Sequence, residues 1–454
     1  MCAVMTHNFN AIFKAYDVRG TVPDQFDDDM ARSIGAAFAK FVSGEDPSVG
    51  QVLVARDMRP SGEAMVAAFA EGVTSQGLDV VDLGLGSTDL LYFAAGTLDA
   101  PGAMFTASHN PAQYNGIKFC LSGARPVGED SGLTQIRDDA AAGVAPAATT
   151  GTVTRRDVLG AFADHVRSFV DVGALRPLKV VADTANGMGG LVVPAVFDGL
   201  PFDLEVMYGE LDGTFPNHPA DPIQPENQRD LMARVLEVGA DIGLAFDGDA
   251  DRVFLVDEQG VGLSGSTTTA ILADAILKSK PGGKVVHNLI CSKAVAEVVV
   301  EAGGEPIRSR VGHSFIKEIM ASSGAVFGGE HSAHYYFADN FRADSGLIAA
   351  VLVLEQLSIR NLPLSELRKP YERYAASGEI NTVVPDTGEV IERVAAAYVG
   401  VQQDRLDGLT VDHGDWWFNL RPSNTEPLLR LNLEAADDEA VAARVAEVKA
   451  HFGL

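Results

Sequence analysis

The chain has 454 residues, of which 46% are hydrophobic and 21% are charged, and this ordinary composition excludes a largely disordered protein. The 35 Lys and Arg residues against 62 Asp and Glu residues give a formal net charge of -27, which argues against nucleic acid or an anionic membrane as the main partner. Phosphorylated small molecules remain possible partners if a pocket concentrates Arg, Lys and His. At roughly 150 residues per domain, we expect about three domains, within a range of two to four.

One pattern of elements occurs three times along the chain: an apolar strand, a turn or cap, an amphipathic helix and a second apolar strand. This order predicts βαβ units, because parallel strands need a crossover connection. The copies are too far apart for a solenoid, so we expect three similar α/β domains in tandem, with mixed sheets. The three segments are 51–83, 178–207 and 283–307.

The C-terminal part of the chain has a different pattern, which indicates an α+β domain. After Pro370, strands are predicted at 379–384, 409–411, 416–420 and 428–433, and helices at 387–399 and 436–451. A linker at 140–153, rich in small residues, and a turn at 257–260 mark two further boundaries. The predicted domains are therefore four: 1–150, 151–257, 258–370 and 371–454.

The first concentration of polar side chains is TASHNPAQYNGIKF at Thr106–Phe119, directly after a predicted strand at Ala103–Phe105. Ser108 is a weak nucleophile unless a base or a positive field assists it, and His109 and Lys118 are candidates for either role. Asn side chains and loop amides also suit a phosphate. A capping serine in a polar turn is the alternative. The density of polar groups at a strand end favours function.

The second concentration is IGLAFDGDADR, in which Asp247, Asp249 and Asp251 follow an apolar strand. Three crowded carboxylates repel one another unless a divalent cation lies between them, and oxygen ligands suit Mg²⁺ or Ca²⁺. A calcium-binding loop that starts at Asp247 and ends at Glu258 is one alternative. However, Arg252 stands at the position where such a loop needs glycine, and the residues before Asp247 are strand-like rather than helical. A solvated acidic turn is the other alternative. We predict a magnesium site, with Arg252 placed to neutralise a phosphate.

The third concentration is GGEHSAHYYF, in which Glu330, Ser332 and His334 alternate. If this stretch is extended, the three side chains point to one side, as a surface for sugar hydroxyls. A Glu/His metal site lacks an evident third ligand nearby. A half-exposed strand with outward polar residues is an equally supported alternative.

The fourth concentration is RPSNTEPLLR at Arg421–Arg430, a proline-containing loop that enters a predicted strand. A guanidinium with hydroxyls, an amide and loop N–H groups is suited to hold a phosphate that is not transferred. An ordinary turn is the alternative. Further positive or donor groups are Arg19 and Lys14 near the N-terminus and Arg310 and His313 in RVGHS.

The cysteines and the apolar runs bear on where the protein works. The three cysteines match neither a disulfide framework nor the spacing of a zinc site; they are Cys2, Cys120 and Cys291. This is typical of a cytosolic protein, whose cysteines are reduced. The N-terminus lacks the pattern of a signal peptide. The longest apolar run, 347–354, is far shorter than the roughly 20 residues of a membrane span. We expect a cytoplasmic protein without a membrane partner.

Taken in order, the four motifs resemble those of the α-D-phosphohexomutase superfamily, most closely its bacterial phosphomannomutase/phosphoglucomutase group. The resemblance covers the whole chain, from AYDVRG at Ala15–Gly20 to the C-terminal tail. It implies three related α/β domains and a fourth α+β domain around a central cleft, in agreement with the four domains counted independently. It also implies hexose phosphates as substrates and one Mg²⁺ ion per chain.

Residue roles follow from the matching motifs. Ser108 would be the phosphoserine, and its phosphate would join Asp247, Asp249 and Asp251 as a metal ligand. Lys118 and Arg19 resemble the family's basic residues near the transferring group, and with His109 and Arg252 they complete the expected catalytic set. The expected substrate contacts are Glu330, Ser332 and His334 for the sugar and Arg421, Ser423, Asn424, Thr425, Arg430, Gly312 and His313 for the rest of the substrate.

One position departs from the pattern of the group. Relatives often carry a lysine where HNLICSK places Ile290, so either Lys293 or Arg310 compensates or the contact is absent. GEHSAH and SNTE look more like phosphomannomutases than phosphoglucosamine mutases.

The resemblance implies reversible interconversion of hexose 6-phosphate and hexose 1-phosphate by a phosphomannomutase, with phosphoglucomutase activity a possible addition. The reaction would pass through phosphorylated Ser108 and a hexose 1,6-bisphosphate, which also acts as activator. The alternatives are a phosphoglucosamine mutase, a sugar phosphatase and a non-catalytic sugar-phosphate sensor. The oligomeric state, monomer or dimer, stays open.

Overall fold

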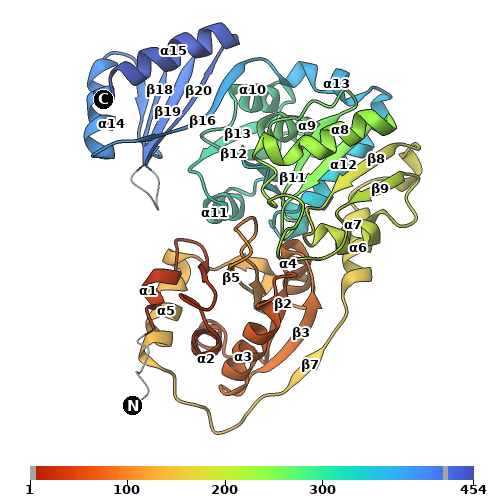
Figure 1. Ribbon diagram of the computed structural model, residues 1–454, viewed down its shortest axis with the longest axis vertical. Coiled ribbons are helices and arrows are strands. Elements are labelled where there is room, and N and C mark those ends of the chain that lie inside the picture. The colour runs from red at the N-terminus through yellow and green to blue at the C-terminus, as the bar shows by residue number, and fades with distance from the viewer. Residues whose placement is uncertain (1–6, 423–427, 454) are drawn as a thin grey trace. The chain divides into compact units, whose positions relative to one another are not determined.

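The computed structural model describes residues 7–422 and 428–453, apart from the side chain of His313. The chain forms two compact units (Figure 1). The first contains the chain up to Leu263 together with His334–Ser365, and the second contains Ser264–Ala333 together with the chain from Glu366 onward.

The first unit begins with a mixed seven-stranded sheet of order β1-β5-β4-β2-β3-β7, with β6 paired to β5. The pairs β2/β3, β2/β4 and β3/β7 are parallel, whereas β5 runs antiparallel to β1, β4 and β6. The parallel pairs confirm the crossover predicted over 51–83. The strands are β1 (Val18–Thr21), β2 (Gln51–Arg56), β3 (Asp79–Leu85), β4 (Gly102–Phe105), β5 (Tyr114–Leu121), β6 (Arg125–Pro126) and β7 (Val153–Arg155).

Helices cover this sheet and share its apolar core. Helix α2 packs against both α3 and α5 (Figure 1). Together with the strands, these helices bury Phe38, Phe69 and Phe119. Helix α2 starts where the Asp27 carboxylate accepts a hydrogen bond from the Met30 N–H, as an N-cap does. The helices are α1 (Phe9–Ile12), α2 (Asp28–Glu45), α3 (Gly62–Thr74), α4 (Thr88–Thr97) and α5 (Leu133–Ala142).

A second, four-stranded sheet of the first unit has the order β11-β10-β8-β9. Strands β8, β9 and β10 are parallel, and β11 folds back antiparallel on β10. The long helix α12, which holds the apolar run 347–354, is buried and packs against β11 and α6. The elements are α6 (Leu159–Arg167), β8 (Lys179–Asp183), α7 (Gly189–Phe197), β9 (Asp203–Met207), α8 (Arg229–Val238), β10 (Ile242–Phe246), β11 (Val253–Asp257), β15 (Tyr335–Phe337) and α12 (Gly346–Arg360).

The second unit contains the parallel strands β13, β12 and β14, in that order, with α9, α10 and α11 packed on them. Ser264 caps α9 and Ser292 caps α10 by accepting hydrogen bonds from N–H groups of the first turns. The elements are α9 (Gly265–Ser279), β12 (Lys284–Asn288), α10 (Lys293–Glu301), β13 (Glu305–Ser309), α11 (His313–Ser323) and β14 (Phe327–Gly329).

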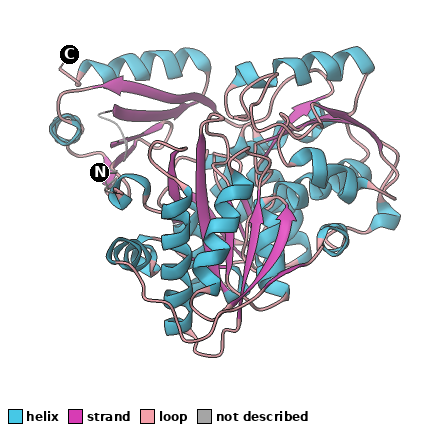
Figure 2. Ribbon diagram, turned by 60° about the horizontal axis from the view of Figure 1, so that its bottom comes forward, coloured by secondary structure: helices cyan, strands magenta, loops and turns pink. Residues whose placement is uncertain are grey.

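The rest of the second unit is an antiparallel sheet of order β16-β20-β19-β18-β17, with α14 and α15 packed on it. Figure 2 shows α15 alongside these strands, near the end of the chain marked C. This arrangement agrees with the α+β pattern predicted after Pro370. The elements are β16 (Ala375–Val383), α14 (Thr387–Ala397), β17 (Gln402–Asp404), β18 (Leu409–Asp412), β19 (Trp417–Pro422), β20 (Leu428–Ala435) and α15 (Asp438–Ala450), preceded by the short α13 (Leu364–Leu367).

The stretch 328–337, in which an extended conformation would put Glu330, Ser332 and His334 on one side, is not extended at its centre. Strand β14 ends at Gly329 and β15 begins at Tyr335, and the residues between them form a turn in which Ala333 has a φ of 65°. Side chains alternate between two faces only along a strand, so alternation does not place Glu330, Ser332 and His334 on one side.

In the described residues, no single helix is long and apolar enough to cross a membrane. The pair Gly346–Arg360 and Leu364–Tyr371, bent by 91°, meets that test by length and composition only.

Candidate active site

Ser108 lies in the loop that joins β4 to β5, in a backbone conformation that non-glycine residues rarely adopt. Its φ is 49°, in the left-handed region. The residue is 5% exposed, and its N–H donates to Thr106 Oγ1 at 2.9 Å. Such a conformation persists when the surroundings determine it more strongly than the local preference does, and it is often found at functional sites.

The three aspartates of DGDAD lie directly behind this serine. All five residues of β10 are buried, and the strand leads straight into Asp247, so Asp247, Asp249 and Asp251 are each at most 1% exposed. Ser108 Oγ donates to Asp247 Oδ2 at 2.7 Å. The close approach requires Gly248, since a Cβ there would lie 2.4 Å from the Ser108 carbonyl oxygen. The two motifs thus form one site.

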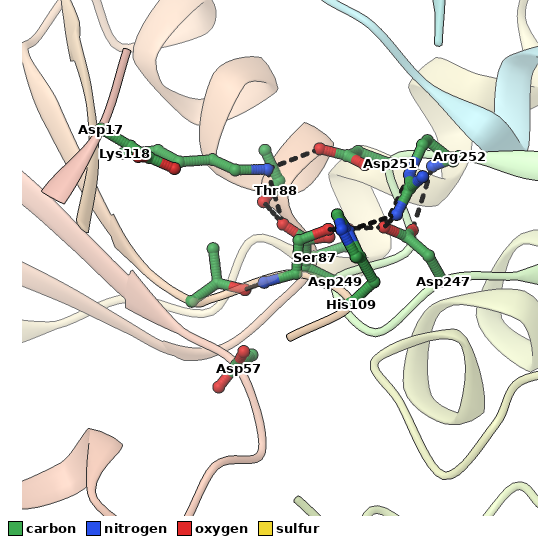
Figure 3. Close-up of polar contacts among 12 residues, drawn as sticks. Asp17, Asp57, Ser87, Thr88, His109, Lys118, Asp247, Asp249, Asp251 and Arg252 are labelled. Carbon is green, nitrogen blue, oxygen red and sulfur yellow. Dashed lines mark hydrogen bonds and ion pairs between the residues drawn. The ribbon is translucent and has the colours of Figure 1, made fainter. Parts of the chain in front are cut away.

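Two cations balance the carboxylates (Figure 3). Lys118 Nζ donates to Asp249 Oδ2 and to Asp251 Oδ2, both at 2.7 Å, and Arg252 Nε donates to Asp247 Oδ2 at 3.0 Å. Burial alone lowers the pKa of Lys118, but the two carboxylates raise it well above its ordinary value. Lys118 is therefore a fixed positive charge at neutral pH, whereas the sequence left it open as a proton carrier.

The carboxylates differ from one another in electrostatic environment. Burial raises the pKa of Asp247 well above its ordinary value, although Arg252 opposes the shift. Burial acts in the same direction on Asp249, but the charge of Lys118 and the hydrogen bonds from Lys118 and Thr88 outweigh it and lower the pKa of that carboxyl. Thr88 Oγ1 donates to Asp249 Oδ2 at 2.6 Å.

These three aspartates fit a hard divalent cation. One oxygen of each lies within 4.8 Å of the other two. Asp249 Oδ1 and Asp251 Oδ1 are buried and accept no hydrogen bond from the described residues. Buried carboxylate oxygens without partners are unfavourable, and oxygen ligands at this spacing are what Mg²⁺ prefers. The donor set therefore suits the predicted magnesium site.

His109 is a neutral acceptor in this arrangement. Its Nδ1 accepts from Arg252 Nη2 at 2.7 Å and lies 3.3 Å from Ser108 Oγ. Burial, and after it the positive charge of Arg252, lowers the pKa of His109 well below its ordinary value. The nitrogen beside the serine hydroxyl belongs to an uncharged imidazole, and its lone pair is taken by Arg252.

Arg19 reaches the serine loop from the neighbouring strand β1. It pairs across the sheet with Gly116, and its guanidinium donates to Asn110 Oδ1 and to Asp17 Oδ2, both at 2.5 Å. Lys14 is exposed and donates to the carbonyl of Ala11 in its own turn. The structure thus brings Arg19 to the loop and leaves Lys14 away from it.

His334 belongs to the same unit as the aspartates. Its Nε2 lies 3.8 Å from Asp251 Oδ1, and its ring stacks with Tyr336 at 6.3 Å between centroids. His334, Asp251 and Asp344 also offer ligand atoms within 4.8 Å of one another. The imidazole therefore lies at the edge of the carboxylate cluster.

Glu330 of the second unit lies next to the start of α11. Its buried carboxylate accepts from Asn288 Nδ2 at 3.1 Å and from the N–H of Gly312 at 3.2 Å. Gly312 has a φ of 133°, a conformation that favours glycine, and His313 begins the helix. Glu330 and Gly312, predicted from separate motifs, are thus hydrogen-bonded. Ser332 follows in the turn, partly exposed.

Arg421 and Arg430 face each other across β19 and β20 and share one carboxylate. They are register partners in the antiparallel pair, and Glu379 of β16 contacts both: Arg421 Nη2 donates to Glu379, and Arg430 Nη1 lies 3.6 Å from Glu379 Oε1. Like charges directly opposite each other are destabilising, so an anion between them is favourable. The predicted partners Ser423, Asn424 and Thr425 lie outside the described residues.

The position at which relatives often carry a lysine is occupied by an apolar residue in this chain. Ile290 is 9% exposed, in the turn after β12. Lys293 Nζ donates to Asp412 Oδ1 at 2.7 Å and to the carbonyl of Gly414 at 2.8 Å, so it is paired with the C-terminal sheet. Arg310 is exposed, with its guanidinium over the ring of Phe315 at 4.7 Å. Of the two compensating candidates, Arg310 is the more accessible.

Sequence reasoning missed several residues that hold the site together. Thr88 is 161 positions from Asp249, and Glu379 is 42 from Arg421. Asp57 and Arg59 lie in the turn after β2, where the sequence pattern indicated only that the strand ends in a turn. Such residues are hard to single out in a sequence, because charged and hydroxyl residues are common in turns.

Comparison with known families accounts for nearly the whole chain. Models of the phosphoglucomutase/phosphomannomutase family match in chain order: alpha/beta/alpha domain I at residues 10–144, domain II at 160–260, domain III at 264–374 and the C-terminal domain at 379–451. This order confirms the predicted fold class of three tandem α/β domains and a C-terminal α+β domain. The exact boundaries at 150, 257 and 370 stay a prediction.

Individual relatives agree. The chain is 43% identical over 435 residues to "Phosphohexose mutases" of Xanthomonas campestris, covering 94% of this chain and 96% of the relative. It is 40% identical over 438 residues to a phosphomannomutase of Salmonella montevideo, covering 94% and 95%. A solved phosphoglucomutase/phosphomannomutase family protein of Burkholderia thailandensis is 32% identical with a TM-score of 0.88, covering 97% of this chain and 96% of that one. The chain therefore belongs to the phosphoglucomutase/phosphomannomutase family and is a phosphohexomutase, an intramolecular phosphotransferase of the isomerase class.

Proposed function

We propose that this phosphohexomutase is a phosphomannomutase that also accepts the corresponding glucose phosphates. It interconverts hexose 6-phosphate and hexose 1-phosphate through a phosphoserine at Ser108 and a hexose 1,6-bisphosphate. The observation that carries the proposal is the 2.7 Å hydrogen bond from Ser108 Oγ to Asp247, which puts a hydroxyl nucleophile against a carboxylate cluster suited to a metal. Support for the sugar comes from relatives named phosphomannomutase at about 40% identity.

In the forward reaction the phosphoryl group passes between two oxygens. The bond from phosphorus to Ser108 Oγ breaks, a bond to the free sugar hydroxyl forms, and the hydroxyl proton leaves to a neighbouring base. The bisphosphate then turns end for end, and its other phosphate returns to Ser108. Such transfer depends on in-line positioning and on neutralising charge more than on new covalent steps.

The residues around Ser108 supply that neutralisation. Mg²⁺, held by Asp247, Asp249 and Asp251, would draw charge from the phosphoryl oxygens. Lys118 and Arg252 add fixed positive charges, and Arg19 holds Asn110 of the serine loop. His109 is uncharged and lies next to the serine oxygen, which makes it a better candidate than Lys118 for moving a proton once the bond from Arg252 to its Nδ1 opens.

The second unit would bind the rest of the substrate. Glu330, Ser332 and Gly312 with His313 offer donors and acceptors for sugar hydroxyls. His334, a residue of the first unit, is a further proposed sugar contact. Arg421 and Arg430, together with Ser423, Asn424 and Thr425, would hold the phosphate that is not reacting. Because the sugar reverses during the cycle, this anchor has to accept a phosphate on either carbon, and a phosphate group offers the same oxygens to the two guanidinium groups whichever carbon carries it.

The test is an intact-mass measurement combined with isomer analysis. The purified protein is incubated with hexose 1,6-bisphosphate and Mg²⁺, and we expect a gain of roughly 80 Da, one phosphoryl group, that peptide mapping places on Ser108. Mannose and glucose 6-phosphates are then converted to their 1-phosphates without release of inorganic phosphate. Stoichiometric release of phosphate would indicate a phosphatase instead, preferential turnover of glucosamine phosphate a phosphoglucosamine mutase, and binding without turnover a sensor.

A further inference from the structure

The guanidinium of Arg59 lies buried beneath the serine loop, with every one of its donors used. Arg59 is 1% exposed and its side chain 0% exposed. A guanidinium has five N–H donors in a fixed planar geometry. All five are bonded: Nε to Asp57 Oδ2 at 3.1 Å, Nη1 to the carbonyls of Pro111 (2.8 Å) and Tyr114 (2.9 Å), and Nη2 to the carbonyls of Ser108 (2.9 Å) and Asn110 (2.7 Å).

Asp57 connects this guanidinium to the other side of the serine. Its Oδ1 accepts the N–H of Arg59 at 2.9 Å, and the carboxylate also accepts a hydrogen bond from Thr106. Thr106 Oγ1 in turn accepts the N–H of Ser108 at 2.9 Å. The N–H of Ser108 is thus held through Thr106 and its carbonyl through Arg59, and both lead back to one carboxylate.

These bonds fix the backbone that carries the serine hydroxyl. Ser108 has a φ of 49°, which a non-glycine residue keeps when both of its peptide groups are fixed. In the observed orientation of the loop, four of its carbonyl groups and the N–H of Ser108 are hydrogen-bonded at once. In that orientation Oγ faces Asp247 at 2.7 Å.

A loop of the neighbouring α/β domain in the same unit covers the guanidinium. The ring of Phe215 lies 5.3 Å from Arg59 Cζ. Gly213 is so close that a Cβ would lie 2.6 Å from Arg59 Cα. Water is therefore kept away from the Arg59 guanidinium, whose partners are one carboxylate and four carbonyl oxygens. Its hydrogen bonds are stronger in this low-dielectric setting than they would be in water.

We propose that Arg59, with Asp57 and Thr106, is the positioning residue of the reaction: it fixes the backbone of Ser108 so that Oγ is aimed for phosphoryl transfer. The inference rests on the proposed function, because it assumes that Ser108 carries the phosphoryl group. Lysine cannot replace the guanidinium, since one ammonium with three donors does not reach five acceptors in a plane.

The test compares Arg59→Lys with Arg56→Lys. Arg56 is a half-buried arginine three residues earlier whose guanidinium donates to the Asp57 carbonyl and not to the serine loop. We expect Arg59→Lys to lower kcat at least fiftyfold while KM for hexose 6-phosphate stays within threefold. The rate of Ser108 phosphorylation by hexose 1,6-bisphosphate should fall by the same factor as kcat. Arg56→Lys should keep kcat within twofold.

If Arg59 contributed only to stability, the Arg59→Lys experiment would give a different result. If Arg59→Lys lowers the unfolding temperature but keeps the wild-type kcat per folded molecule, the proposal is overturned. Should Arg59→Lys fail to fold, the near-isosteric Thr106→Val takes its place: we expect a fall in kcat of about tenfold, and an unchanged kcat overturns the proposal. Failure of the proposed function is recognised separately, because the wild-type protein itself would then show neither turnover nor a phosphorylated Ser108.

Discussion

The serine and aspartate region of the first unit and the paired arginines of the second unit are built in opposite ways. Around Ser108, charges are buried and matched: Lys118 bridges two aspartates and Arg252 pairs with the third. At the C-terminal sheet, two arginines share a single, partly exposed Glu379, and Arg421 Nη1 is buried without a hydrogen bond among the described residues.

Under the proposed function, the difference corresponds to two tasks in phosphoryl transfer. A reacting centre gains when its charges are fixed beforehand, since no reorganisation is then needed in the transition state. An anchor has to release and rebind a phosphate in two orientations, so an internal carboxylate that a phosphate can displace is an advantage. We therefore expect substitutions in the first region to act on kcat and substitutions in the second to act on KM.

The largest expected effect is that of Ser108→Ala. Without the hydroxyl no phosphoryl group can be carried, and loss of a covalent nucleophile costs on the order of 10⁴-fold or more in kcat. Turnover is measured by isomer analysis, and hexose 6-phosphate binding by calorimetry should be largely retained. Ser122→Ala, a serine of the same domain that donates to the carbonyl of Asp99, is the control. Near-normal turnover of Ser108→Ala would defeat the nucleophile assignment.

Asp249→Asn should have the next largest effect. The change removes a ligand charge and half of the ion pairs of Lys118, so we expect kcat to fall roughly 100-fold and the Mg²⁺ concentration for half-maximal activity to rise about tenfold or more. Both are measured by titrating metal into chelator-treated protein. Asp230→Asn, an exposed carboxylate on α8, should titrate as the wild type does. An unchanged metal requirement in Asp249→Asn would contradict the metal site.

Arg421→Ala should change KM instead. Loss of a charge-assisted bond of about 1.5–3 kcal/mol predicts a KM increase of roughly 10- to 100-fold, equal for the 1- and 6-phosphates. Initial rates with each isomer provide the measurement. The exposed Arg405→Ala, which breaks only a pair with Glu392, is the control. An effect confined to one isomer would count against a shared anchor.

Glu379→Gln should have the smallest effect, and in the opposite direction. Because its carboxylate occupies the position between the two arginines, neutralising it removes a competitor, and we expect phosphate to bind a few-fold more tightly. The same change leaves two arginines opposite each other, so the free energy of unfolding should fall by about 1 kcal/mol. Calorimetry with hexose 6-phosphate measures the change in phosphate binding, and thermal unfolding measures the change in stability. Glu392→Gln is the control for both. Weaker phosphate binding would mean that Glu379 supports the anchor.

Much of the first region could be predicted from local sequence. An apolar strand followed by three aspartates in five positions places the carboxylates at a strand end, because β10 is buried throughout. In the same way, the polar motif TASHNP directly after a short strand predicted that Ser108 lies in a loop. The extended geometry considered for Glu330 to His334 does not hold, because the turn between β14 and β15 breaks the two-residue period. A pattern of apolar and polar residues does not reveal a left-handed residue such as Ala333.

By itself, the sequence determined which side chains are available for the chemistry and the local elements that carry them: the serine loop, the aspartates after β10 and the arginines on β19 and β20. Only the tertiary structure decided which of these meet. Ser108 reaches Asp247 across 139 positions, and Arg59 reaches four carbonyl groups about 50 positions away. The reason is physical: strand and turn propensities act over a few residues, whereas a buried charge takes its partners from whatever the packed chain brings within hydrogen-bond distance.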